Sequence, residues 1–123
     1  MKAMTVEQVR ETYKCDDRMA QVIAAMSTVD GVAGFKAGRV EGFLFVEVDR
    51  PFPRHRKTRG IWINTKRKSV HFVVGAGDDV TSAFVDRLAR AVIAAGMGFV
   101  NVQSYFHNFK YLAMSGDYTA EFV

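Results

Sequence analysis

The spacing of hydrophobic residues changes at Gly31, and this change constrains the fold more than any other feature of the chain. Before Gly31, apolar side chains recur every three to four residues, which is typical of an amphipathic helix. Thr5 and Gln8 have the spacing of a capping box at its start. The pattern predicts a helix over about 5–29 and leaves a break at Asp16 open, because Asp16 is itself a good N-cap residue.

Beyond Gly31, apolar and polar side chains alternate, as they do in strands with one buried face. Four strands are expected in this part of the chain, at 32–36, 40–49, 61–64 and 69–75. Pro51 and Pro53 end the second of them, because proline cannot donate to a sheet ladder. The short segment 65–68 joins the last two strands into a hairpin over 60–75.

A second helix is expected to begin at Asp78 or Asp79, after a glycine-rich hinge at 75–77, and to end at Gly96. Its predicted buried stripe is Val80, Phe84, Val85, Leu88, Ala89, Val92, Ile93 and Ala95. A last strand begins at 99–103, and the tail from Gly116 is expected to be irregular.

These elements predict an α+β fold for residues 1–123, as a single domain. The expected architecture is an antiparallel sheet of four to five strands with two helices packed on one face. A ferredoxin-like order of elements stays open, although no strand is expected before the first helix.

Apolar residues make up 49% of the chain and charged residues 24%, a globular balance that excludes a disordered chain or a disulfide scaffold. Cys15 is the one cysteine, so no internal disulfide can form, which favours a reducing compartment. The first thirty residues lack the apolar core of a signal peptide, and the longest apolar run, near 91–98, is too short to span a bilayer. We therefore expect a soluble, cytoplasmic protein with no membrane partner.

Positive charge is concentrated in one short part of the chain. Between Arg50 and Lys68 there are eight basic residues in nineteen positions and no acidic ones. The rest of the chain carries nine basic and thirteen acidic residues, so this segment alone makes the net charge +4. A concentrated block of this kind produces a local field that attracts phosphates or acidic protein surfaces.

The pattern favours a small nucleic-acid-binding protein that contacts phosphates of DNA or RNA through the loop and hairpin at 50–68. The expected binding residues are Arg54, Arg56, Lys57, Arg59, Lys66, Arg67 and Lys68, with Trp62 available to stack on a base. The alternative is a compact regulator or inhibitor, of the kind that viruses and mobile elements encode, which docks the same basic segment on an acidic partner protein.

Aromatic residues are expected on the sheet face away from the helices. Phe43 and Phe45 alternate with Leu44 and Val46, so the two pairs point to opposite faces. Further rings follow at Tyr105, Phe106, Phe109 and Tyr111. An open aromatic face either stacks on bases or pairs with another copy of the chain, so a homodimer stays open.

Catalytic patterns are weak, and we expect a binding protein rather than an enzyme, with no cofactor and no metal. His55, His71 and His107 lack the short spacings of a zinc site. The second alternative is a metal-dependent nuclease, because Glu41, Glu47 and Asp49 share one strand face and carboxylates bind Mg²⁺.

Overall fold

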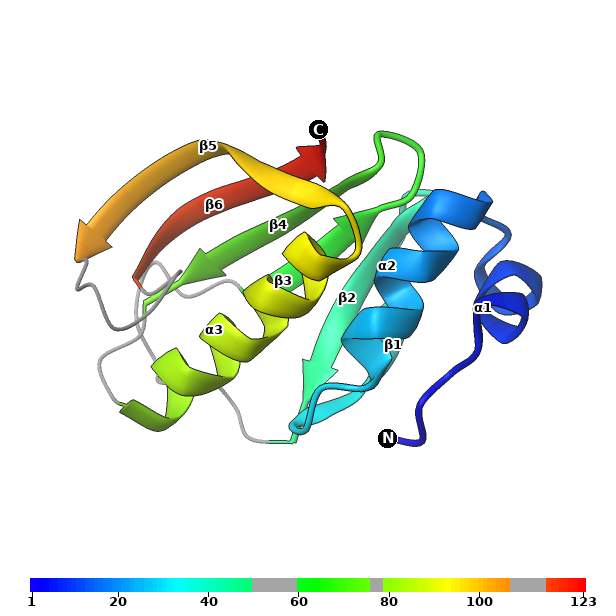
Figure 1. Cartoon of the computed structure of the whole chain (residues 1–123), viewed down its shortest axis with the longest axis horizontal. Helices are drawn as coiled ribbons and strands as arrows, with labels where there is room; N and C mark the ends of the chain where they lie inside the picture. Colours follow the sequence, from blue (N-terminus) through cyan, green and yellow to red (C-terminus); the bar gives the residue numbers. More distant parts are fainter. Residues whose placement is uncertain (50–59, 76–78, 107–114) are drawn as a thin grey trace.

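Two helices precede the first strand, and a third helix lies between the fourth and fifth strands (Figure 1). This computed structural model describes residues 1–49, 60–75, 79–106 and 115–123. The helices are α1 (Val6–Tyr13), α2 (Asp17–Ser27) and α3 (Asp79–Ala94). The strands are β1 (Val32–Ala37), β2 (Phe43–Val48), β3 (Gly60–Asn64), β4 (Ser69–Val74), β5 (Met97–Phe106) and β6 (Ser115–Phe122).

The strands form one antiparallel sheet in the order β1-β2-β3-β4-β6-β5. The first four strands are neighbours in chain order, and none of the described helices lies between them in the sequence. The α+β class is therefore confirmed, but with six strands and three helices in place of four to five strands and two helices. The ferredoxin-like order left open by the sequence is not followed, since that order places a helix directly after its first strand.

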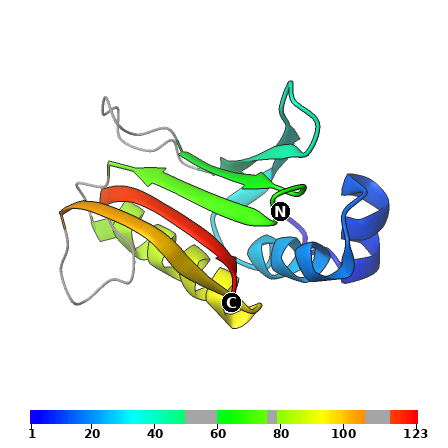
Figure 2. The same ribbon diagram turned by 90° about the horizontal axis from the view of Figure 1, so that it is seen from above.

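Both α2 and α3 pack on one face of the sheet, and α1 lies outside α2 (Figures 1 and 2). The core lies between these helices and the sheet. It includes Met19, Ile23 and Met26 of α2, Leu88 and Val92 of α3, and Leu44, Ile63, Val70, Phe72 and Ala120 of the sheet. No helix formed by the described residues covers the opposite face, which is called the open face below (Figure 2).

The predicted first helix is divided in two at the position that the sequence left open. Thr5 caps α1 in a capping box, in which the Gln8 amide donates to Thr5 Oγ1 and the Thr5 amide donates to Gln8 Oε1. Lys14 then takes the left-handed conformation, with φ of 55°, and ends α1. Asp16 begins α2 by accepting from the Met19 amide. Each piece therefore has its own cap.

The predicted stripe of α3 is confirmed at its centre and wrong at Val80 and at Ile93, which is 37% exposed. Phe84, Leu88 and Val92 are buried against the sheet. Val80, in the first turn and one turn before Phe84, is 60% exposed. Gly96, with φ of +106°, ends the helical region, because glycine adopts this left-handed conformation without steric cost.

The C-terminal tail is a strand, and the expectation of irregular structure from Gly116 is wrong. Residues of β6 pair with β4 on one side and with β5 on the other. Tyr118 and Ala120 point into the core, while Thr119 between them is only half-buried. This alternation gives the tail a buried face, and burial of that face stabilises it as an internal strand.

Candidate nucleic-acid interface

One row of side chains runs across the open face from edge to edge. Residues that lie opposite each other in an antiparallel pair point to the same face of the sheet. The register of the sheet therefore places six side chains in one line, one from each strand. They are Lys36, Phe45, Trp62, His71, Thr119 and Asn101.

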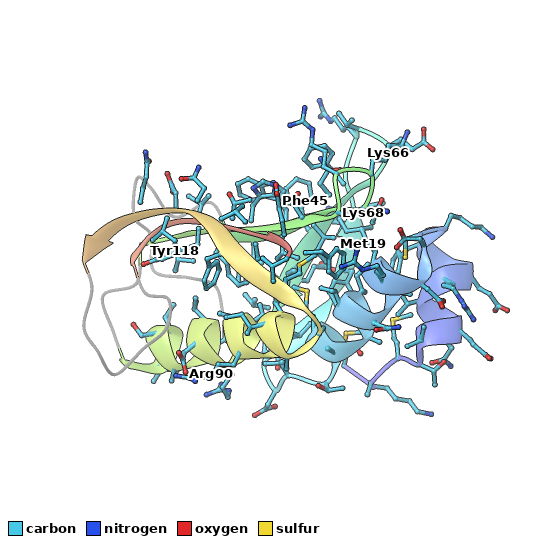
Figure 3. All side chains as sticks on the ribbon, turned by 45° about the horizontal axis from the view of Figure 1, so that its top comes forward. Met19, Phe45, Lys66, Lys68, Arg90 and Tyr118 are labelled. Carbon is cyan, nitrogen blue, oxygen red and sulfur yellow. The ribbon has the colours of Figure 1, made fainter. Side chains whose placement is uncertain are left out.

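The centre of this row is aromatic. The Trp62 and His71 rings are stacked, with centroids 5.3 Å apart and planes at 14°. Phe45 lies directly opposite Trp62 on the neighbouring strand and is 44% exposed. Figure 3 shows Phe45 on the side of the sheet away from Arg90 of α3. Phe45, Trp62 and His71 thus form an accessible aromatic platform, and we use this name for these three residues.

Hydrogen bonds fix the His71 ring in this platform. Ser69 Oγ lies 3.0 Å from His71 Nε2, and Thr119 Oγ1 lies 3.4 Å from Nδ1. Burial lowers the pKa of His71; Glu121 raises it and Arg67 lowers it further. The ring is therefore held in its neutral form near pH 7, and in this form it stacks on Trp62.

The Ser69–His71 contact does not make a catalytic pair. A serine nucleophile must reach its substrate, and the Ser69 side chain is buried within the sheet. Cys15, the other candidate nucleophile, is half-buried, and burial raises the pKa of its thiol. A raised pKa keeps the thiol protonated and unreactive at neutral pH.

The β3–β4 turn carries three of the predicted cations at one end of the sheet. Asn64 Oδ1 accepts hydrogen bonds from the amides of Lys66 and Arg67, at 3.2 and 3.0 Å. Lys68 has φ of 55° and completes the turn before β4 begins. The hairpin predicted over 60–75 is confirmed, and its turn is held by a side chain rather than by glycine.

Two of these three cations lie against acidic side chains. Lys66 Nζ is 3.2 Å from Glu41 Oε2, and Lys68 Nζ is 2.8 Å from Asp16 Oδ2. Arg67 is exposed and forms no ion pair with any residue in the described part of the chain. Of the three, Arg67 therefore has its guanidinium most available for an external anion.

The other predicted cations, Arg54, Arg56, Lys57 and Arg59, lie outside the described residues, as do His55 and His107. The described residues that flank this basic segment are Asp49 and Gly60, at the start of β3. The β3–β4 turn follows the other end of β3, about 13 Å away at 3.3 Å per residue. Trp62 lies midway along β3, between the two points where basic residues leave the sheet.

The carboxylates considered for a metal do not gather. Among the residues that the structure describes, no group of three His, Cys, Asp or Glu side chains is placed to hold a metal ion. Glu41 instead faces Lys66. Glu41, Glu47 and Asp49 are all exposed, so they are placed as solvated surface carboxylates.

Sequence reasoning missed Lys36 and the Trp62–His71 stack. A signal for the stack was present, because a hairpin closed by 65–68 places Asn64 opposite Ser69 and therefore Trp62 opposite His71. Lys36 could not be placed in this row without knowing the register of β1 against β2, which contains a bulge between Val32 and Gly34.

Among the helices of the described chain, none combines the length and the apolar character needed to cross a membrane. Comparison with known protein families, with curated proteins and with solved structures finds no match to this chain.

Proposed function

We propose that this protein binds single-stranded nucleic acid on the open face, with bases against the aromatic platform and phosphates against the surrounding cations. The observation that carries the proposal is the exposed ring of Phe45 beside the half-buried, stacked pair of Trp62 and His71, whose outer surfaces remain for a base. Bases stack on aromatic side chains at about 1–3 kcal/mol each, whatever their sequence.

The position of the rings favours single strands over duplexes. Phe45, Trp62 and His71 lie within a sheet surface and do not project from it as a helix or a β-ribbon would. A sheet surface can stack only on bases that are already unpaired and turned outward. Duplex nucleic acid would meet only the cations, through its phosphates.

The charge around the platform indicates which half of the face the strand would follow. Lys36 lies at the β1 end of the row and Arg67 at the β3–β4 turn. Glu121 and Asp117 lie on β6, beyond His71, where they would repel phosphates. Glu47 of β2 also lies on this face, two residues beyond Phe45. We therefore expect the nucleic-acid backbone over the part of β1, β2 and β3 nearer to the β3–β4 turn.

The basic segment at 50–59 adds positive charge to the chain through its composition. It contributes five basic residues and no acidic ones, and it is joined to the sheet at Gly60 of β3. Each phosphate neutralised on a single strand contributes about 0.7 to the slope of log affinity against log salt concentration. Binding should therefore weaken markedly as salt rises.

The test is fluorescence anisotropy with labelled probes of about 20 nucleotides, longer than the ~4–16 nucleotides that one small binding domain covers. Single-stranded and duplex probes are compared at about 50 mM and about 200 mM salt. The single strand should bind more tightly, and Phe45→Ala should weaken its binding by about 5-fold or more, because one stacking partner is lost.

Val80→Ala is the matched control, because it also removes exposed apolar surface but lies on α3. It should leave binding unchanged. If the two probes bind equally and Phe45→Ala has no effect, the protein attracts phosphates only, and base stacking on the aromatic platform is excluded. Absence of binding to either probe at low salt would overturn the proposal and favour the acidic protein partner.

A further inference from the structure

The edge strand β5 has none of the charged residues that usually prevent edge strands from pairing. It is ten residues long, and neither a charged residue nor a proline occurs from Met97 to Phe106. It lies at the end of the strand order, and no described strand pairs with its outer side (Figure 1). A long, uncharged edge presents unpaired backbone N–H and C=O groups that favour addition of a further strand.

The opposite edge of the same sheet is protected. Strand β1 has only six residues and carries Lys36. The Met1 amino group donates to the Val32 carbonyl oxygen at 2.9 Å, so the N-terminal segment occupies the start of this edge. Short length, a lysine and coverage by another segment are the usual means of blocking edge-to-edge pairing. The contrast singles out β5.

Strand β5 also exposes apolar side chains. Val100 and Val102 are each 52% exposed. The strand has irregular register against β6 between Phe99 and Asn101, and again between Ser104 and Phe106. Between these two points it pairs regularly with β6 from Asn101 to Ser104, so the central part of the edge keeps a regular ladder that a further strand can extend.

We infer that β5 pairs with β5 of a second copy of this chain, antiparallel and about a two-fold axis near Val102. Such an axis places Val102 against its own counterpart and Asn101 against Gln103 of the second copy. Like charges opposite each other destabilise a self-paired strand, and β5 has no charge to oppose. A second copy presents a strand of the same length that also lacks charge, so the two edges match along their whole length.

The rest of the molecule permits this arrangement. Two strands, β4 and β6, separate β3 from β5. Pairing through β5 therefore leaves the β3–β4 turn of each copy, which carries Lys66, Arg67 and Lys68, apart from the paired edge. It also leaves the aromatic platform uncovered, so the inference stands independently of the proposed nucleic-acid binding.

The first test is the oligomeric state by analytical ultracentrifugation. The wild type should sediment as a dimer, and Val102→Lys as a monomer, because the substitution places two like charges together at the axis. Val40→Lys adds the same charge at a valine that is 64% exposed outside the strands, and it should stay dimeric. Circular dichroism and thermal unfolding establish that each variant is folded.

The second test traps the contact without disrupting it. In a Cys15→Ser background, Val102→Cys should form a disulfide-linked dimer when a thiol oxidant is added, because facing residues of antiparallel strands have Cα atoms about 4.5–5.5 Å apart. Val40→Cys, in the same background, should form no disulfide-linked dimer. A monomeric wild type at high concentration would overturn the inference, as would a dimer that survives Val102→Lys and does not cross-link through Val102→Cys.

Discussion

Lys68 and Asp16 join the β3–β4 turn to the start of α2. Lys68 Nζ lies 2.8 Å from one carboxylate oxygen of Asp16, and the other oxygen accepts from the Met19 amide. The same side chain therefore caps a helix and holds a cation that the sequence assigns to nucleic-acid binding. The hydrogen bond from Lys68 is the main reason that the pKa of Asp16 is lowered.

Asp16→Ala should lower the free energy of unfolding by about 1 kcal/mol, the usual effect of losing an N-cap. Lys68→Ala should lower it by less, about 0–1 kcal/mol, because the ion pair is exposed to solvent. Urea denaturation at low and high salt measures both. Glu11→Ala, which removes an exposed carboxylate from α1, should have almost no effect. An Asp16→Ala protein as stable as the wild type would contradict the capping role.

Acidification should destabilise the protein through His71. Its pKa is lowered in the folded state, so below about pH 6.5 the unfolded chain binds a proton more readily than the folded one. Stability should therefore be full above pH 6.5 and fall as the pH drops below it.

Urea midpoints at about pH 7.5 and about pH 5.5 test this, around the ordinary histidine pKa. His71→Gln should show a smaller loss between the two pH values than the wild type. An NMR titration of the His71 ring gives the pKa directly. A value at or above the ordinary range would contradict the role of burial.

Two glycines with similar backbone conformation should differ in their tolerance of alanine. Gly31 has φ of +103°, and an added Cβ would lie 2.8 Å from the Phe84 ring. Gly60 has φ of +95°, and no described residue lies within 4 Å of the added atom. Gly60→Ala should cost about 1–2 kcal/mol from backbone strain alone. Gly31→Ala should cost about 1–3 kcal/mol more, because the ring must move. Thermal unfolding ranks them, and equal costs would contradict the close contact with Phe84.

The salt dependence of binding should distinguish Arg67 from other arginines. Arg67→Ala should reduce the slope of log affinity against log salt by about 0.7 for a single-stranded probe, which corresponds to one phosphate contact. Arg87→Ala removes the same charge from the exposed side of α3 and should leave the slope unchanged. Equal slopes for the wild type and Arg67→Ala would show that Arg67 makes no contact with a phosphate.

Elements whose contacts are local could be predicted well from the sequence. The capping box at Thr5 and the cap at Asp16 are each defined within four residues, and both occur where expected. The hairpin over 60–75 also depends on neighbouring residues, because its turn is held by Asn64. Val40 was wrongly included in its strand, since β2 begins at Phe43.

Elements that depend on contacts between distant parts of the chain could not be predicted from the sequence. Strand β6 pairs with β4, and the Thr119–His71 contact joins residues 48 positions apart. The alternation of Tyr118, Ala120 and Phe122 was a signal for it, but one strand of this length is ambiguous without its neighbours. Likewise, charge counting placed Lys66 and Lys68 in the binding set without their acidic partners, Glu41 and Asp16, which are brought close only by the fold.

The most direct test of the nucleic-acid interface uses the protein's only tryptophan, which lies within the aromatic platform. Intrinsic fluorescence of Trp62 is followed as an unlabelled single-stranded oligonucleotide is added at low salt. We predict a saturable change in emission that is reversed by added salt and weakened by Phe45→Ala. If the oligonucleotide binds, as judged by anisotropy, while Trp62 emission stays constant, the bases do not stack on the open face and the account is contradicted.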